Sequence, residues 1–251
     1  MTAPTPFSHS APGTRRTRIK MCGLTREQDV DAAVAAGADA VGFVLYPPSP
    51  RAVSPQRAAE LSRRLPAFVT PVLLFVNENA SNIEAALSIN KSAVVQFHGE
   101  EVLENCEAAG RPYLRAARIP MGPGAPGFDL LEYAHRFPSA QGILLDAHVD
   151  GYGGGGQTFD WTAFNWSLLP PNVGSRLVLS GGLDAANVTD GILQVRPWAV
   201  DVSSGIECDG PPLPDGRPGK TLKGIKDPDK MARFVAAVRA ADATLAQPTV
   251  R

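Results

Sequence analysis

Short apolar runs alternate along the chain with segments whose apolar residues recur at helical spacing. The runs are apolar at successive positions, as expected of parallel strands that are buried on both faces. We expect eight strands, at Ile19–Cys22, Ala40–Leu45, Pro71–Val76, Ala93–Phe97, Tyr113–Ala117, Gly142–Asp146, Arg176–Leu179 and Ala199–Val202.

The helical segments between these runs carry start and stop signals. Ser54-Pro55 predicts a helix start, because proline is tolerated in the first turn, where its missing N–H needs no partner. Thr25 and Asp184 are predicted to cap two further helices with their side-chain oxygens. The expected helices cover Thr25 to about Gly37, Ser54 to the residue before Pro66, Asn79–Asn90, Glu101–Ala109, Leu130–Phe137, Phe159–Leu169, Ala185–Gln194 and Pro228–Ala241.

The repeated alternation of strand and helix predicts an α/β fold in which a parallel sheet closes into a (β/α)8 TIM barrel. A doubly wound open sheet is the alternative. We find no domain boundary and expect a single catalytic domain over residues 18–243. Residues 1–17 are rich in Pro, Ser and Thr and are expected to form a disordered tail, with a C-terminal tail at residues 244–251.

The composition fits this fold class. The chain has 251 residues, of which 44% are hydrophobic, and a formal net charge of -1. A barrel of about 250 residues fits this length, and the near-neutral charge gives no support for nucleic-acid binding. No apolar run reaches ~18 residues, so no membrane span is expected. Three cysteines without a CxxC spacing predict neither a disulfide framework nor a zinc site, and we expect a cytoplasmic protein.

The segment Cys208–Lys226 differs from the other connections. It is long and polar, and it is rich in Pro, Gly and Lys. A connection of this kind is uncommon inside a compact domain. We therefore expect a mobile lid or a solvated excursion.

Two reactive side chains, Cys22 and Asp146, end the first and the sixth predicted strand. Barrel enzymes carry their catalytic residues at the carboxyl ends of their strands, so we expect both side chains at one site. There, one group can accept a proton while the other donates one. Lys20 lies on the same strand face as Cys22 and is expected to lower the pKa of the thiol. Taken individually, Cys22 also fits a small buried hydrophobe, and Asp146 fits a helix cap or a salt bridge.

Small residues fill the loops after the sixth, seventh and eighth strands, at Gly153–Gly156, Ser180–Gly182 and Ser203–Gly205. Glycine lets backbone N–H groups approach an anion closely, and barrels hold phosphate in the loops after strands seven and eight. A single glycine pair more often only makes a turn. The two successive loops together predict a phosphate site.

Arg51 follows the stiff loop Y-P-P-S-P and is predicted to lie over the barrel mouth. Its guanidinium suits a carboxylate in bidentate contact, and a solvated surface arginine is the alternative. His98 is interpreted as a residue that braces its own loop. For Arg115 and Arg118 the pattern leaves open whether they face the pocket or solvent.

Eight motifs extend over almost the whole chain, in the order I-K-M-C-G-L-T (Ile19–Thr25), A-D-A-V-G-F-V (Ala38–Val44), S-P-R (Ser49–Arg51), Q-F-H-G-E (Gln96–Glu100), L-L-D (Leu144–Asp146), G-Y-G-G-G-G-Q-T-F-D-W (Gly151–Trp161), L-S-G-G-L (Leu179–Leu183) and D-V-S-S-G-I-E (Asp201–Glu207). Together they resemble the phosphoribosylanthranilate isomerases of tryptophan biosynthesis. The sixth loop departs from the family pattern, because Gly155 stands where the family has a hydroxyl residue.

The resemblance implies an aldose–ketose isomerase that catalyses the Amadori rearrangement of N-(5-phosphoribosyl)anthranilate to 1-(2-carboxyphenylamino)-1-deoxyribulose 5-phosphate. It implies that Asp146 is the general acid at the ribose ring oxygen and Cys22 the general base at sugar carbon two. It also implies that Arg51 binds the anthranilate carboxylate. No metal or organic cofactor is implied, because the protonated open ring is its own electron sink. The implied phosphate site lies at Gly181, Gly182, Ser203, Ser204 and Gly205.

Two alternatives stay open at this point. One is the related aminophosphoribosyl isomerase of histidine biosynthesis. That family has a pair of aspartates at the catalytic strand ends, whereas the first strand of this chain ends in Cys22. The other is a non-catalytic phosphosugar-binding barrel, which needs the phosphate loops but not Cys22 and Asp146 together. The pattern does not define an oligomeric state and leaves a homo-oligomer open.

Overall fold

The computed structural model describes residues 16–120, 127–147, 160–161, 164–166, 169–174, 176–212 and 219–247. The glycine run Gly153–Gly156, with Gly155 in it, lies outside these ranges. So do five of the eleven residues of the expected helix Phe159–Leu169.

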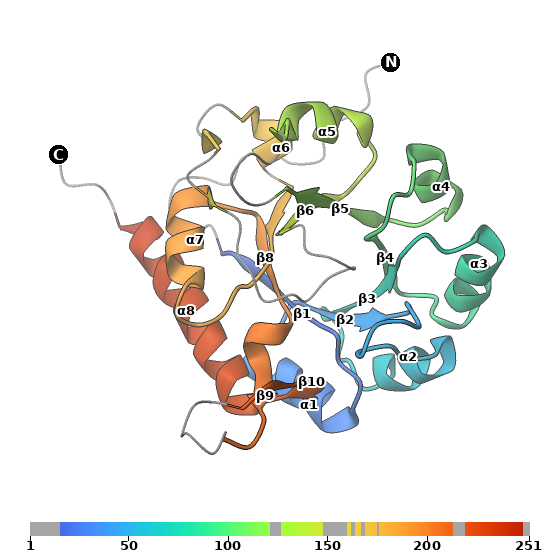
Figure 1. The fold of residues 1–251 in the computed structure, drawn as a ribbon, viewed down its shortest axis with the longest axis horizontal. Coiled ribbons are helices and arrows are strands. Elements are labelled where there is room, and N and C mark those ends of the chain that lie inside the picture. The colour runs from blue at the N-terminus through green and yellow to red at the C-terminus, as the bar shows by residue number, and fades with distance from the viewer. Residues whose placement is uncertain are drawn as a thin grey trace.

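Eight parallel strands form a closed barrel in which each strand pairs with its neighbours in sequence and β1 pairs with β8 (Figure 1). The predicted (β/α)8 barrel is therefore confirmed, and the open-sheet alternative is excluded because the ring has no edge strand. The strands are β1 (Arg18–Cys22), β2 (Ala40–Val44), β3 (Thr70–Phe75), β4 (Val94–Phe97), β5 (Tyr113–Ile119), β6 (Gly142–Ala147), β7 (Leu177–Leu179) and β8 (Ala199–Val202).

The helices surround this barrel on the outside (Figure 1). They are α1 (Glu27–Ala36), α2 (Pro55–Ser62), α3 (Ala80–Ile89), α4 (Leu103–Ala108), α5 (Leu130–Arg136), α6 (Pro171–Gly174), α7 (Val188–Val195) and α8 (Pro228–Ala246). Across the described part of the chain, each helix is too short or too polar to cross a bilayer.

The helix starts follow the predicted capping in part. Ser54 caps α2 by accepting a 3.1 Å hydrogen bond from the backbone N–H of Arg57. Asp184 accepts from two backbone N–H groups in the turn that precedes α7. The predicted cap at Thr25 is wrong, because α1 begins only at Glu27. The Thr25 hydroxyl instead donates to the carbonyl of Gly224, 2.8 Å away.

The alternation of residues along each strand divides the barrel into two apolar regions. Outward-facing residues such as Phe43, Leu73 and Ile143 pack with the helices in one large buried cluster. Small and medium residues, Leu144 and Val178 among them, form a separate cluster inside the barrel. This cluster fills the inside of the barrel below the carboxyl ends of the strands. The polar residues at those ends line the open end of the barrel, which we call the barrel mouth.

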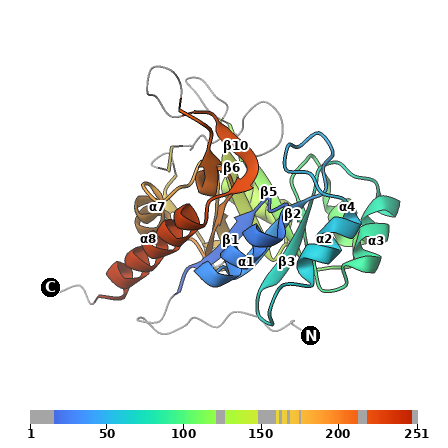
Figure 2. The ribbon, with the colours of Figure 1, turned by 90° about the horizontal axis from the view of Figure 1, so that it is seen from below.

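The segment Cys208–Lys226 forms a hairpin at its two ends. Strands β9 (Glu207–Asp209) and β10 (Thr221–Lys226) pair antiparallel, and β10 lies beside the loop between β1 and α1 (Figure 2). The end of the segment is part of the packed fold, because β10 ends in a fully buried lysine, and the lid or solvated excursion stays a prediction for the rest. Residues 213–218 of the segment lie outside the described ranges.

The two ends of the described chain meet. The hydroxyl of Thr17 donates a 2.6 Å hydrogen bond to Asp242 in α8, so the last residues of the expected N-terminal tail are fixed against the barrel. Helix α8 continues to Ala246, three residues beyond the expected boundary at 243. Residues 1–15 of the expected tail lie outside the described ranges.

Candidate active site

Cys22 ends β1 with its side chain inside the barrel mouth. Lys20 lies on the same face, as the alternation along the strand predicts. The register places Gly42 of β2 beside Cys22. A methyl group on Gly42 would lie 2.7 Å from Cys22 Sγ and 3.2 Å from Lys20 Nζ, so the two side chains share the space that this glycine leaves open.

The ammonium group of Lys20 is buried in an ion pair. Its Nζ lies 2.7 Å from Asp201 Oδ1 of β8, and the hydroxyl of Ser180 is 3.4 Å from the other carboxylate oxygen. Burial raises the pKa of Cys22, although the nearby Lys20 cation acts to lower it. The expectation of a lowered thiol pKa is therefore wrong, because Asp201 already neutralises Lys20 and the loss of water outweighs the remaining attraction.

Asp146 lies near the end of β6 and is held by a histidine. His98 Nε2 is 3.1 Å from Asp146 Oδ2, and the amide nitrogen of Gln96 is 3.0 Å from His98 Nδ1. An amide nitrogen only donates, so Nδ1 accepts and the ring proton sits on Nε2, which donates to the carboxylate. His98 thus belongs to the site and does more than brace a loop. The same-face spacing of Gln96 and His98 at the end of β4 is the signal that indicates it.

The register of β5 shows which of its two arginines faces the barrel mouth, a point that the sequence left open. Arg115 is buried on the outer face, where it donates to backbone carbonyls, among them those of Phe97 and Gly99. Its guanidinium carbon also lies 4.9 Å from the ring centre of Phe137. Arg118 is on the opposite, inner face and pairs in register with Asp146. Arg118 therefore faces the barrel mouth and Arg115 does not.

Arg51 is only 5% exposed, which excludes a solvated surface arginine. Its Nε and Nη2 atoms contact the two carboxylate oxygens of Glu207 at 2.6 and 2.7 Å. A methyl group on Gly23 would lie 2.5 Å from the Arg51 side chain. The aliphatic part of Arg51 therefore fills the space beside Gly23, the residue that follows Cys22. Sequence reasoning missed the role of Glu207, because 156 positions separate the two partners and nothing local links them.

The loops after β7 and β8 meet at the predicted phosphate site. Gly181 and Gly182 have φ angles of 80° and 62°, a backbone conformation that residues with a side chain rarely adopt. A methyl group on Gly205 would lie 2.0 Å from the carbonyl oxygen of Leu183, so the two loops touch through this glycine. The hydroxyl of Ser203 donates to the carbonyl of Cys22 at 3.1 Å, which ties the β8 loop to the end of β1.

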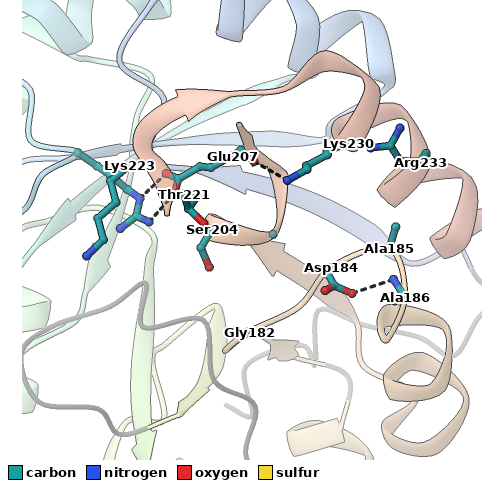
Figure 3. A pocket seen from close by; sticks show the side chains of 12 residues that line it. Gly182, Asp184, Ala185, Ala186, Ser204, Glu207, Thr221, Lys223, Lys230 and Arg233 are labelled. Atoms are coloured by element: carbon teal, nitrogen blue, oxygen red, sulfur yellow. Dashed lines mark hydrogen bonds and ion pairs between the residues drawn. The ribbon is translucent and has the colours of Figure 1, made fainter. Parts of the chain in front are cut away.

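A cavity of about 540 Å³ is lined by Arg51 and by the loops after β7 and β8 (Figure 3). Basic residues contribute to the same wall. Cys22 and Asp146 are not among the lining residues. Cys22 directly precedes Gly23, against which the lining residue Arg51 packs, and Asp146 lies against Gly181, which precedes the lining residue Gly182. The lining residues are Arg51, Gly182, Asp184, Ala185, Ala186, Ser204, Gly205, Glu207, Thr221, Lys223, Lys230 and Arg233.

Known proteins are similar in sequence to this chain over most of its length. The sequence model of the family described as N-(5'phosphoribosyl)anthranilate (PRA) isomerase matches residues 19–212. The N-(5'-phosphoribosyl)anthranilate isomerase of Methylibium petroleiphilum is 59% identical over 231 residues, which make up 92% of this chain and 98% of that protein. The chain belongs to this family.

Solved structures of the family share the fold. A phosphoribosyl anthranilate isomerase in complex with reduced 1-(o-carboxyphenylamino)-1-deoxyribulose 5-phosphate superposes with a TM-score of 0.67 at 35% identity, over 89% of this chain and 99% of that one. The Thermotoga maritima enzyme, described as mutually generated monomers of a dimeric isomerase, superposes with a TM-score of 0.67 at 34% identity, over 89% of this chain and 98% of that one.

Family membership assigns the activity. The protein is an isomerase that interconverts an aldose and a ketose, and it acts on N-(5'-phosphoribosyl)anthranilate in tryptophan biosynthesis. The two alternatives that the sequence left open, the histidine-pathway isomerase and the non-catalytic barrel, are thereby set aside. The family model ends at residue 212, so β10 and α8 lie beyond the matched span.

Proposed function

We propose that Asp146 and Cys22 carry out the rearrangement as general acid and general base. Asp146 donates its proton to the ribose ring oxygen, the bond from that oxygen to carbon one breaks, and the nitrogen lone pair forms a protonated Schiff base. Cys22, as thiolate, then removes the proton from carbon two, and those electrons return to the nitrogen. The resulting enolamine becomes the ketone, 1-(2-carboxyphenylamino)-1-deoxyribulose 5-phosphate, by moving a proton from oxygen two to carbon one.

The observation that carries this proposal is the placement of the two groups. Cys22 ends β1, and Asp146 is the last residue but one of β6, so both belong to the same end of the barrel. Cys22 is next to Gly23, against which Arg51 of the cavity wall packs, and Asp146 lies against Gly181, next to Gly182 of that wall. A thiol and a carboxyl group on different sides of one sugar can act on different atoms of it in opposite directions.

Arg51 and the loops after β7 and β8 both line the cavity, which supports binding of the two charged groups of the substrate there. We propose that the phosphate binds to backbone N–H groups at Gly181, Gly182, Ser203, Ser204 and Gly205. The glycines among them have no side chain to keep an anion away. The anthranilate carboxylate would meet Arg51, whose guanidinium has five donors, of which Glu207 engages two.

Turnover by the purified protein tests the activity in this chain. Loss of the fluorescence of N-(5'-phosphoribosyl)anthranilate should follow addition of the enzyme and should require it. Samples in which the fluorescence decays at the rate of the uncatalysed breakdown would contradict the proposal.

Replacing Arg51 by Ala is expected to raise the KM by about 10- to 100-fold and to change kcat much less. A carboxylate remote from the reacting atoms is bound equally in the ground state and the transition state, so its loss appears in KM. Steady-state kinetics give both constants, and Arg57→Ala, which removes a half-buried arginine of α2 that pairs with Glu27, is the control. Equal losses in kcat and kcat/KM would argue against the carboxylate role.

We further propose a homo-oligomer in the cytoplasm. All three cysteines are free thiols, as is common in a reducing compartment. Phe68 is 99% exposed, and its backbone has a φ of 73°. An exposed aromatic side chain of this kind suits contact with a second copy of the chain. The T. maritima relative is described as dimeric.

Light scattering during gel filtration is expected to show a multiple of the 26.5 kDa chain mass, and Phe68→Ser is expected to lower that mass. The exposed polar substitution Ser81→Ala on α3 serves as the control. A monomeric mass for the unmodified protein at micromolar concentration would contradict this assembly.

A further inference from the structure

The carboxylate of Glu207 is fully buried and is engaged from three sides. Arg51 contacts both of its oxygens, as described above. The backbone N–H of Gly224 donates to Oε1 at 2.8 Å, and Lys226 Nζ donates to the same oxygen at 3.1 Å. Both of these further donors belong to β10, the strand that pairs with β9 and lies beside the loop between β1 and α1.

The charges of this cluster do not cancel. Arg51 and Glu207 alone would form a neutral pair, and a neutral pair attracts a ligand carboxylate only weakly. Lys226, whose side chain is fully buried, adds a second cation, so the three side chains carry a net charge of +1. Its remaining contacts are with the carbonyl and the hydroxyl of Ser203, in the phosphate loop.

Burying the charged side chain of Lys226 costs free energy, because the ammonium group loses its water. The loss of water lowers the pKa of Lys226, and Glu207 counters part of that effect. A buried ion pair is by itself weak support for stability, because the cost of removing both ions from water offsets much of their attraction. A cation held at such a cost beside a cavity that receives an anionic substrate points to a role in binding.

The geometry also fixes how Arg51 can bind. Glu207 contacts the edge formed by Nε and Nη2, and a planar guanidinium presents a second edge formed by Nη1 and Nη2. Because the first edge is locked, the plane and direction of the second edge are set before the substrate arrives. Preorganised donors lose less conformational entropy when they bind.

We propose that Glu207 and Lys226 are positioning residues for recognition of the anthranilate carboxylate. Glu207 orients Arg51, and Lys226 restores the positive charge that Glu207 would otherwise remove. The hairpin β9–β10 is then the element that completes the carboxylate end of the site. This inference rests on the proposed role of Arg51.

The test compares two ligands that differ only in the carboxyl group. One is reduced 1-(o-carboxyphenylamino)-1-deoxyribulose 5-phosphate, and the other is its phenylamino counterpart without the carboxyl group. Calorimetry on Lys226→Met should show the first ligand bound about tenfold more weakly and the second within about twofold of the unmodified protein. Lys226→Arg should restore most of the loss, and Lys220→Met, at an exposed lysine just before β10, should change neither affinity.

A merely structural role gives a different pattern. It would weaken both ligands by the same factor, and that result, or unchanged affinity for both, would overturn the inference. Lys226→Gln replaces the Met variant if the latter fails to fold, since it removes the charge and keeps a hydrogen-bond donor.

Arg51→Ala, measured with the same pair of ligands, separates this inference from the proposal beneath it. If that variant shows the carboxylate-specific loss and Lys226→Met does not, the inference alone fails. If Arg51→Ala shows no such preference, the carboxylate role and this inference fail together.

Discussion

Replacing Asp146 by Asn is expected to lower kcat by about 10²- to 10⁴-fold while the KM changes little. The amide is nearly the same size and still accepts from the ring of His98, so the site should keep its shape. It has no acidic proton to give to the ribose ring oxygen, so ring opening loses its catalyst. Stopped-flow or steady-state fluorescence of the aminobenzoate group measures the effect.

The matched control for this substitution is Asp190→Asn, at an exposed aspartate in α7. It makes the same chemical change away from the barrel mouth and should leave kcat unchanged. Near-normal turnover by the Asp146 variant would require another proton donor and would remove Asp146 from the mechanism.

Replacing Cys22 by Ser is expected to lower kcat by a similar factor, about 10²- to 10⁴-fold, with ligand affinity retained. Serine fits the space over Gly42 that the thiol occupies. Its hydroxyl does not ionise near neutral pH, so the proton on carbon two loses its acceptor. Cys106→Ser makes the same change at a cysteine buried in α4 and should alter stability more than turnover.

Alkylation of Cys22 by iodoacetamide provides an independent measurement of the thiol. Because burial raises its pKa, the thiolate is the minor form at neutral pH, and its fraction rises about tenfold for each pH unit below that pKa. The rate should therefore climb from pH 7 to pH 9 without levelling off. The reduced carboxyphenylamino sugar phosphate should slow it, and an unchanged rate would place Cys22 outside the substrate site.

The order of strands and the position of Cys22 and Asp146 could be predicted because they depend on local pattern. A buried parallel strand is apolar along its length, and its last residues stand at the barrel mouth whatever the rest of the chain does. The same reasoning reached the glycine loops after β7 and β8. Each of these features is specified by fewer than ten neighbouring residues, as is usual for strands and turns.

The features that the sequence did not reveal depend on contacts between distant residues. The bidentate pair of Arg51 and Glu207 joins positions 156 apart. The buried Lys226 looked like part of a polar excursion, because its charge gave no sign of a buried partner. The raised pKa of Cys22 likewise depends on the depth of the barrel mouth and on Asp201, which neutralises Lys20.

The contact between the β7 and β8 loops bears on attempts to redesign this enzyme for other sugar phosphates. The carbonyl oxygen of Leu183 occupies the space that the Cβ atom of any side chain at position 205 would need. Neither loop can be diversified separately, since any residue larger than glycine at position 205 would push its neighbour out of line. A directed-evolution library should therefore keep this pair constant and vary other loops of the barrel, so that the proposed phosphate site keeps its shape.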